Sequence, residues 1–240
     1  MSHPPIGHIA VVIPAMDEAD TLGECLDSVF DAVNELQLAM PRHYAVSVVA
    51  VLDSCSDSSE LIAAKYEALT TLTVNHANVG QSRADGIRAA LDQLRSPRSA
   101  TWIANTDADS RVPIGWLTQQ VRFADSGADV LLGTVEPLSA DLTTRQALAW
   151  EASHPDGRAL GHVHGANLGV RASAYLRVGG FAAKDEHEDV NLVEQLRAIS
   201  ASVVTSDSFP VVTSGRSVGR TPGGYAGYMR LLDQLVEPAG

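Results

Sequence analysis

The first half of this chain alternates short runs of β-branched residues with longer amphipathic segments. A run of β-branched residues predicts a strand, and apolar residues spaced three and four apart predict a helix. The predicted strands span 8–13, 44–52, 72–75 and 100–104, and the predicted helices between them span 20–38, 57–69 and 80–94. Because strands that alternate with helices at this spacing form βαβ units, we expect an α/β fold. It should have a mostly parallel central sheet with helices on both faces.

The second half of the chain has a less regular rhythm. The predicted helices span 113–126, 142–151 and 188–200, and the predicted strands span 129–135, 166–170, 202–205 and 209–213. A short helix begins at Arg171, and the Gly179-Gly180 pair breaks the chain after it. Because neither an internal repeat nor a Pro/Ser-rich linker interrupts the sequence, we expect residues 1–240 to form a single domain. Its halves would be about 8–110 and about 111–213, followed by a glycine- and arginine-rich tail, 214–240, that could move.

The charge of the chain narrows the classes of ligand. A formal net charge of −12 argues against general binding to nucleic acid or to anionic membranes, which need basic surfaces. It leaves room for a nucleotide, because backbone N–H groups, a metal ion and a few arginines can hold phosphates in an acidic protein. The chain has only Cys25 and Cys55, no visible signal peptide and no apolar run of about 18 residues. We therefore expect a reduced, cytoplasmic protein that is not embedded in a membrane.

Two carboxylates one residue apart follow the predicted buried strand at 100–104. Residues i and i+2 of an extended chain point the same way, so Asp107 and Asp109 can converge on one cation. Hard carboxylate oxygens suit Mg²⁺ or Mn²⁺, which usually shares its coordination sphere with the phosphates of a substrate. An acidic turn that caps the next helix is the alternative interpretation, so the meaning of the pair depends on its surroundings.

Polar clusters also follow the other three strands of the first half. They are Pro14-Ala15-Met16-Asp17-Glu18, then Asp53-Ser54-Cys55-Ser56-Asp57, and then Asn78-Val79-Gly80-Gln81-Ser82-Arg83. In open α/β sheets, ligands bind beyond the carboxyl ends of the strands. We therefore expect all four polar clusters to face one crevice.

The order of these clusters resembles that of family 2 glycosyltransferases of the GT-A fold, which transfer a sugar from a nucleotide-diphosphate donor. The family's P-x-x-N-E, V-D-D-G-S-x-D, D-x-D, G-x-N-x-x-x-R and E-D motifs correspond to residues 14–18, 51–57, 107–109, 165–171 and 188–189. Its N-x-G-x-x-x-A-R-N-x-G element is matched loosely by Asn78, Gly80, Arg83 and Gly86. Asp17 and Asp85 stand where the family usually has Asn, and Leu52 where it has Asp. The resemblance spans roughly residues 8–200.

The resemblance implies a nucleotide-sugar site in the first half, with Mg²⁺ or Mn²⁺ as the cofactor. The residues that it implies for the donor are Pro14, Ala15, Asp17, Glu18, Asp53, Asn78, Gly80, Arg83, Asp107 and Ala108, and those for the metal are Asp109 and Asp107. The bend at Pro14-Ala15 would let main-chain groups meet a uracil-like base, and Asp53 would accept a hydrogen bond from the base. Structural alternatives stay open for three of these residues. They are an Asx turn for Asp53, a charge near the first helix's positive end for Glu18, and an ion pair with Asp53 or Asp109 for Arg83.

The E-D motif implies the catalytic residues. Asp189 would be the base that removes the proton of the acceptor hydroxyl if the sugar's configuration inverts, with Glu188 as the second candidate. The structural alternative is that acidic residues at a helix N-terminus simply interact favourably with the helix dipole.

The acceptor site and the tail have weaker signals. His164, Gly165 and Asn167 are expected to shape the acceptor pocket, while a zinc site at His162 and His164 has no third ligand at a suggestive spacing. In the tail, Arg216 and Arg220 could close over the diphosphate or over an anionic acceptor. A solvated tail is the alternative.

These observations predict a soluble, metal-dependent and inverting glycosyltransferase with a UDP- or GDP-type donor and a small soluble acceptor. Oligomers are possible. A sugar nucleotidyltransferase is one alternative, but such enzymes open with a glycine-rich phosphate loop where this chain has residues 14–18. A catalytically inactive, nucleotide-binding member of the fold is another. The departures at Asp17, Leu52 and Asp85 favour it, and the retention of Asp107, Asp109 and Asp189 argues against it.

Overall fold

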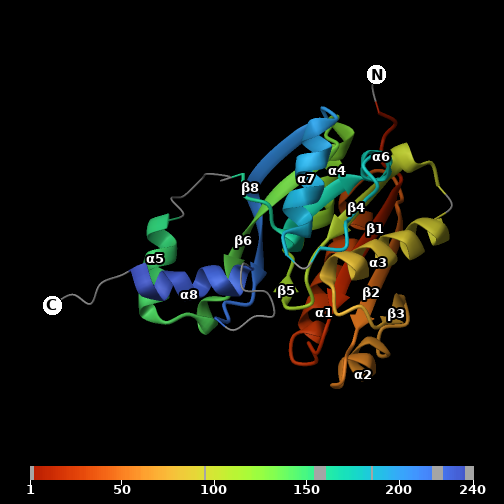
Figure 1. Ribbon diagram of the computed structural model, residues 1–240. Helices are drawn as coiled ribbons and strands as arrows, with labels where there is room; N and C mark the ends of the chain where they lie inside the picture. Colours follow the sequence, from red (N-terminus) through yellow and green to blue (C-terminus); the bar gives the residue numbers. More distant parts are fainter. Residues whose placement is uncertain (1–2, 95, 154–160, 185, 218–223, 236–240) are drawn as a thin grey trace.

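The computed structural model describes residues 3–94, 96–153, 161–184, 186–217 and 224–235, and these form an eight-stranded sheet with helices on both faces (Figure 1). The strands in chain order are β1 (His8–Ala15), β2 (Ala45–Asp53), β3 (Leu69–Val74), β4 (Thr101–Asn105), β5 (Ser110–Arg111), β6 (Val130–Pro137), β7 (Leu168–Arg171) and β8 (Val203–Thr213). Their order across the sheet is β3-β2-β1-β4-β7-β6-β8-β5.

The first half of the sheet is parallel, as the alternating sequence pattern predicts. Strands β3, β2, β1 and β4 all run the same way, so their carboxyl ends lie at one edge. Strand β7 then runs antiparallel to both β4 and β6, while β6 and β8 are parallel. The α/β expectation with a mostly parallel sheet is confirmed, and the antiparallel pairs are confined to β7 and the short β5.

The helices are α1 (Leu22–Ala39), α2 (Ser59–Ala63), α3 (Val79–Leu94), α4 (Trp116–Asp125), α5 (Thr144–Ser153), α6 (Ala172–Arg177), α7 (Glu188–Ala198) and α8 (Tyr225–Leu235). Short 3₁₀ turns span Arg98–Ala100, Ser139–Asp141 and Gly165–Asn167. Helices α5 and α8 pack on each other at one end of the molecule, beside the ends of β6 and β8 (Figure 1).

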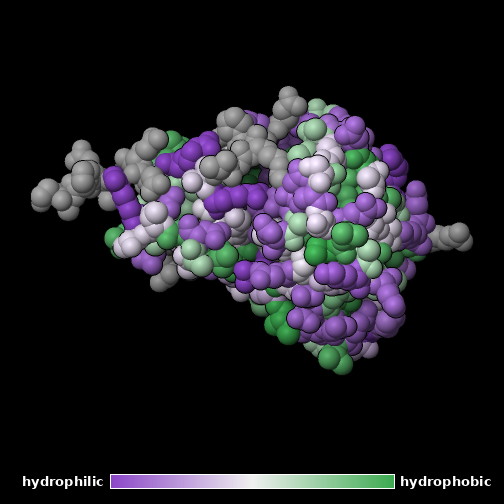
Figure 2. Space-filling model, turned by 90° about the horizontal axis from the view of Figure 1, so that it is seen from below, coloured by the Kyte–Doolittle hydropathy of each residue, from purple (hydrophilic) through white to green (hydrophobic). Residues whose placement is uncertain are grey.

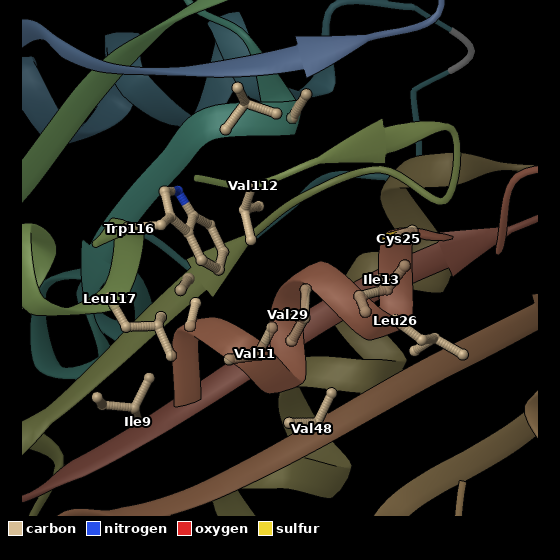
Figure 3. Packing of buried hydrophobic residues seen from close by; sticks show 14 of the residues in the cluster. Ile9, Val11, Ile13, Cys25, Leu26, Val29, Val48, Val112, Trp116 and Leu117 are labelled. Carbon is tan, nitrogen blue, oxygen red and sulfur yellow. The ribbon is translucent and has the colours of Figure 1, made fainter. Parts of the chain in front are cut away.

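Successive side chains of β1 point to opposite faces of the sheet and so build two separate hydrophobic layers. Ile9, Val11 and Ile13 pack in one layer with residues of α1 and α4, among them Leu26 and Trp116 (Figure 3). Burying one such aliphatic side chain contributes about 1.5–3 kcal/mol. This layer ties α1 and α4 to the strands that carry the polar clusters.

The second layer lies on the opposite face of the sheet. Ala10 and Val12 of β1 pack there with Ile87 of α3 and with Leu192 and Leu196 of α7. Helices α3 and α7, which begin at Val79 and Glu188, are therefore held on the same face. The N-terminal ends of both helices carry predicted site residues.

Two predicted elements differ from the structure. The helix predicted at 57–69 is only the five-residue α2. After it, the N–H groups of Lys65 and Tyr66 bond to carbonyls three residues back, which ends the α-helical pattern, and β3 begins at Leu69. The two late strands predicted at 202–205 and 209–213 are one strand, β8. Its pairing with β6 shifts register between Gly133 and Val135, which absorbs the residues that the sequence pattern assigned to a break.

The surface offers no obvious apolar face in the view from below, where hydrophobic residues form separate patches among hydrophilic ones (Figure 2). The most exposed large hydrophobic side chains, Leu38 and Leu61, lie on different helices. Within the described part of the chain, no helix combines the length and the apolar character that crossing a membrane requires.

Candidate functional site

All four strand-end clusters of the first half line one cavity of about 900 Å³. Pro14 lies near the end of β1 and Asp53 is the last residue of β2. Asn78 lies in the loop after β3, and Asp107 in the loop after β4. The second half of the chain closes the cavity. Its lining residues there include His162, His164, Gly165, Glu186, Glu188, Asp189, Thr213, Arg216, Tyr225 and Tyr228.

At the end of β1, the predicted residues divide between two roles. Pro14, Ala15 and Glu18 line the cavity. Asp17, predicted to contact the nucleotide, is exposed and lies outside the lining. Its Oδ1 accepts hydrogen bonds from the backbone N–H of Ser56 at 2.6 Å, so it braces the loop after β2. A φ of +46° at Asp17 is tolerated because Asp adopts the left-handed region more readily than most residues.

Asp53 is 3% exposed, and both of its carboxylate oxygens already have donors within the protein. These donors are the backbone N–H groups of His76, Ala77 and Asn78 and the hydroxyls of Ser54 and Ser82, at 2.7–3.0 Å. Burial by itself raises the pKa of Asp53, but these hydrogen bonds outweigh it and lower the pKa to about 2. The carboxylate therefore holds the β3–α3 loop and also lines the cavity, and this bracing differs from the Asx turn that was the structural alternative from the sequence.

The β3–α3 loop shapes the wall beside Asp53. Asn78 donates from Nδ2 to the carbonyl of Lys184 at 2.9 Å and accepts from the N–H of Gln81, so it joins the start of α3 to the segment before α7. Gly80 lies outside the cavity lining. A Cβ on Gly80 would lie 2.5 Å from the carbonyl oxygen of Ala182, so this glycine permits close packing against the same segment.

Arg83 connects three walls of the cavity. Its buried guanidinium donates from Nη2 to Asp107 Oδ1 at 2.5 Å, and its Nε lies 3.4 Å from Glu188 Oε1. Nη1 donates to the carbonyl of Gly165 at 3.2 Å, and the ring of Phe181 lies under the guanidinium at 5.9 Å. The structural alternative from the sequence was an ion pair of Arg83 with Asp53 or Asp109, but in the structure Arg83 pairs with Asp107.

Asp107, Ala108 and Asp109 all line the cavity, directly after β4. Burial and the negative charge of Asp107 raise the pKa of Asp109 to about 6, although Arg216 opposes this shift. Beneath them, burial raises the pKa of the Cys25 thiol, which donates to the carbonyl of Asp107 at 3.2 Å. Two neighbouring carboxylates that repel each other in a cavity are a donor set that fits a hard divalent cation.

A second cluster of potential metal ligands lies outside the cavity. Among the described residues, only Asp17, Cys55 and Asp57 place three ligand-type atoms within 4.8 Å of one another. Asp17 and Asp57 are exposed, and their carboxylates accept backbone hydrogen bonds that brace the loops around them. His162 and His164 have no third ligand by this measure in the described part of the chain, so the zinc alternative gains no support.

Glu188 and Asp189 begin α7, after His187 in a left-handed conformation at φ +58°. Burial raises the pKa of Glu188 while Arg83 opposes the shift. Asp189 is half-buried, lines the cavity, and accepts from the N–H of Gly165 at 2.7 Å through Oδ2. No lysine or arginine in the described part of the chain lies within ion-pair distance of it. Its other oxygen, Oδ1, accepts from the N–H of Val190 at 2.7 Å, so two backbone hydrogen bonds fix the carboxylate in the wall of the cavity.

The predicted acceptor residues divide as well. His164 lines the cavity with its ring edge-on to Tyr225, 6.2 Å between centroids, and Gly165 lines it beside Arg83. Asn167 lies outside the lining. Its side chain accepts from Trp116 Nε1 at 2.9 Å and donates to the carbonyl of Thr134 at 2.9 Å, so it joins α4 and β6 in the core.

The tail reaches the donor side of the cavity. Arg216 makes a two-pronged contact with Glu18 at 2.8 and 3.0 Å. Arg220, predicted beside it, lies outside the residues that the structure describes. Tyr225 and Tyr228 of α8 line the cavity although neither was among the predicted site residues. The i, i+3 spacing of these two tyrosines could have found them only if the tail had been predicted to hold a helix, which it was not.

The family model described as glycosyl transferase family 2 matches residues 10–172. This chain therefore belongs to glycosyltransferase family 2, as its motif order suggested. No curated protein matches it.

Several solved structures share the fold, and their identities are low. TarS residues 1–349 of S. aureus is 16% identical with a TM-score of 0.63, covering 94% of this chain and 64% of that one. The mannosyltransferase PcManGT of Pyrobaculum calidifontis, in complex with GDP-Man and Mn²⁺, is 18% identical with a TM-score of 0.65, covering 95% and 61%. Glucosyl-3-phosphoglycerate synthase of Mycobacterium tuberculosis, with Mn²⁺, UDP and phosphoglyceric acid, is 14% identical with a TM-score of 0.59, covering 97% and 80%. The GT-A fold is thereby confirmed, and the chain spans less than two thirds of the TarS and PcManGT chains.

Proposed function

We propose that this chain transfers a sugar from a nucleotide-diphosphate donor to an acceptor hydroxyl, with Mg²⁺ or Mn²⁺ and with inversion at the anomeric carbon. One observation carries the proposal: Asp107, Asp109 and Asp189 line the same cavity although they come from the two halves of the chain. A donor site and a base at one cavity are the minimum that glycosyl transfer needs. Membership of family 2 and the likeness to a GDP-Man complex support a donor of this class.

The donor would bind across the first half, about 8–110, with its base near Pro14 and Ala15 and its diphosphate near Asp107 and Asp109. Asp109 and Asp107 would hold the divalent cation, which as a Lewis acid would neutralise the charge of the departing diphosphate. Arg83 would keep Asp107 in place. Since Asp53 already accepts five hydrogen bonds from the protein, it would shape the base pocket through its loop.

The acceptor would enter from the second half, about 111–213, beside His164 and the tyrosines of α8. Asp189 would take the proton of the acceptor hydroxyl. The acceptor oxygen would form its bond to the anomeric carbon as the bond to the diphosphate breaks, which releases the nucleoside diphosphate. Glu188 is less suited to be the base, because Arg83 lies 3.4 Å from its carboxylate.

The test is a thermal-shift panel of UDP, GDP and ADP, each with and without Mn²⁺, on the wild type and on Asp109→Asn. A ligand that binds only the folded chain stabilises it by mass action, by about 2.7 kcal/mol at a hundred times its Kd. We expect one nucleotide to raise the melting temperature in a Mn²⁺-dependent way, and Asp109→Asn to remove the metal dependence. Asp92→Asn, at an exposed carboxylate of α3, is the matched control.

The panel also separates the alternatives. A chain that binds nucleotides but is inactive would show the shift in melting temperature without turning over any nucleotide sugar. An assay for hydrolysis of UDP- and GDP-sugars would detect such turnover. If neither UDP nor GDP stabilises the wild type with Mn²⁺ present, the proposed donor class is wrong.

A further inference from the structure

The guanidinium of Arg216 lies between two carboxylates that follow different strands. It contacts both oxygens of Glu18, after β1, and its Nη2 also lies 3.0 Å from Asp109 Oδ2, after β4. Arg216 itself follows β8 and is 39% exposed, while the side chains of Glu18 and Asp109 are 7% and 15% exposed. The arginine that follows the last strand in the chain is thus paired with Asp109, the carboxylate that the proposed function assigns to the metal ion.

The backbone holds Arg216 in this position. The N–H of Ser214 donates to the carbonyl of Asp109 at 3.1 Å, and the N–H of Gly215 donates to Asp141 Oδ2 at 2.8 Å. Asp141 lies in the 3₁₀ turn after β6. The segment is therefore anchored on both sides of the cavity edge, and the arginine is presented to Asp109 by the fold.

Among the described residues, acidic groups outnumber basic ones in the ion pairs around the cavity. In these pairs Arg83 and Arg216 contact four carboxylates, those of Glu18, Asp107, Asp109 and Glu188, so negative charges exceed positive charges by two. A divalent cation at Asp109 would balance these charges, but it would arrive beside the guanidinium of Arg216, which repels it. A diphosphate brings negative charge that both cations can share.

We propose that Arg216 is a tethered counter-ion that competes with the divalent cation for Asp109 until a nucleoside diphosphate binds. The inference rests on the proposed function for the identity of the nucleotide. Arg216 gives up only its contact with Asp109, because the two-pronged contact with Glu18 can persist. The cation and the nucleotide consequently strengthen each other's binding, and the cation alone binds weakly.

The experiment measures Mn²⁺ affinity from the EPR signal of the free ion, with and without UDP or GDP, for the wild type, Arg216→Gln and Arg216→Lys. We expect Arg216→Gln to bind Mn²⁺ alone about tenfold more tightly, the scale for one unit charge in a partly exposed site. The nucleotide should enhance Mn²⁺ binding less in this variant than in the wild type. Arg216→Lys keeps the charge and should stay close to the wild type.

Two further variants locate the effect. Arg88→Gln removes one exposed positive charge from α3 and should leave Mn²⁺ affinity unchanged. Adding Asp109→Asn to Arg216→Gln should abolish the gain, since the competition is at Asp109. A gain that survives in the double variant, or an Arg216→Gln affinity equal to or below that of the wild type, overturns the proposal.

The test remains decisive if Arg216→Gln fails to fold. Asp141→Ala releases the N–H of Gly215 and should raise the affinity for Mn²⁺ alone in the same direction, and an unchanged affinity overturns the proposal. Failure of the proposed function looks different. In that case neither UDP nor GDP binds the wild type, while the nucleotide-free comparison still reports on competition between Arg216 and the cation.

Discussion

Arg83 and Asp107 form an ion pair in the lining of the cavity, with 2.5 Å between Nη2 and Oδ1. The arginine comes from α3 and the aspartate from the loop after β4, so the pair joins two of the four strand-end clusters. The arginine side chain is 3% exposed, and its Nε also approaches Glu188 of α7. One buried cation thus links the donor side of the cavity to the helix that carries the proposed base.

Replacing Arg83 with methionine should destabilise the fold by about 3–5 kcal/mol, because it leaves the carboxylate of Glu188, which is 8% exposed, as a buried charge without the cation beside it. Urea unfolding at neutral pH measures this loss. Arg83→Lys should lose less stability than the methionine variant. A lysine ammonium can neutralise one carboxylate, but it lacks the planar guanidinium that contacts both Asp107 and Glu188. A loss below about 1 kcal/mol for the methionine variant, the range of an exposed pair, would contradict the linking role.

Asp189→Asn should reduce sugar transfer by about 10²–10⁴-fold, the range for loss of a general base, and should leave nucleotide affinity unchanged. The amide oxygen of asparagine can still accept from the N–H of Gly165, so the local structure should survive. Steady-state kinetics and nucleotide titration check the two halves of this expectation. Glu188→Gln is the comparison, and a larger loss of turnover there than in Asp189→Asn would move the base to Glu188.

Asp53 should contribute to stability in a pH-dependent way. Its pKa of about 2 in the folded protein lies below the usual value near 3.9. The contribution is therefore present above about pH 4 and disappears as the pH falls towards about 2, and it amounts to about 2–3 kcal/mol. Urea unfolding of the wild type and Asp53→Asn between pH 7 and pH 2 should show their stability difference shrinking with acid. A difference that stays constant over this range would mean that the carboxylate is not held as the hydrogen bonds indicate.

Asn167→Ala should cost stability and leave the acceptor's KM unchanged. The substitution strands the buried indole N–H of Trp116 and the carbonyl of Thr134, and an unsatisfied buried group costs about 1–3 kcal/mol. His164→Ala should do the reverse, because His164 lines the cavity. Unfolding curves and acceptor kinetics on both variants distinguish the two roles, and a raised acceptor KM with normal stability in Asn167→Ala would restore its predicted acceptor contact.

The α/β class could be predicted because local pattern alone encodes it. Residues 9–13 form an unbroken apolar run, which is typical of a parallel strand that is buried on both faces, and β1 does lie between two hydrophobic layers. The clusters after the first four strands were predictable as neighbours for a related reason. Parallel strands bring their carboxyl ends to one edge, whatever the side chains there do.

The partners of individual polar side chains could not be read in this way. Asp17 and Asn167 carry the residue types of ligand contacts, yet Asp17 braces a loop and Asn167 joins two core elements. Which donor meets a carboxylate depends on loops that are distant in sequence and on how closely backbones approach.

The linear order of residues was sufficient for the layered α/β architecture, for membership of family 2 and for gathering acidic groups at one edge, because periodicity and strand direction are local properties. Only the folded chain set Arg83 between Asp107 and Glu188 and brought Arg216 against Asp109. Those pairings arise where β4, α7 and the segment after β8 meet, and the positions of such segments follow from packing across the whole sheet.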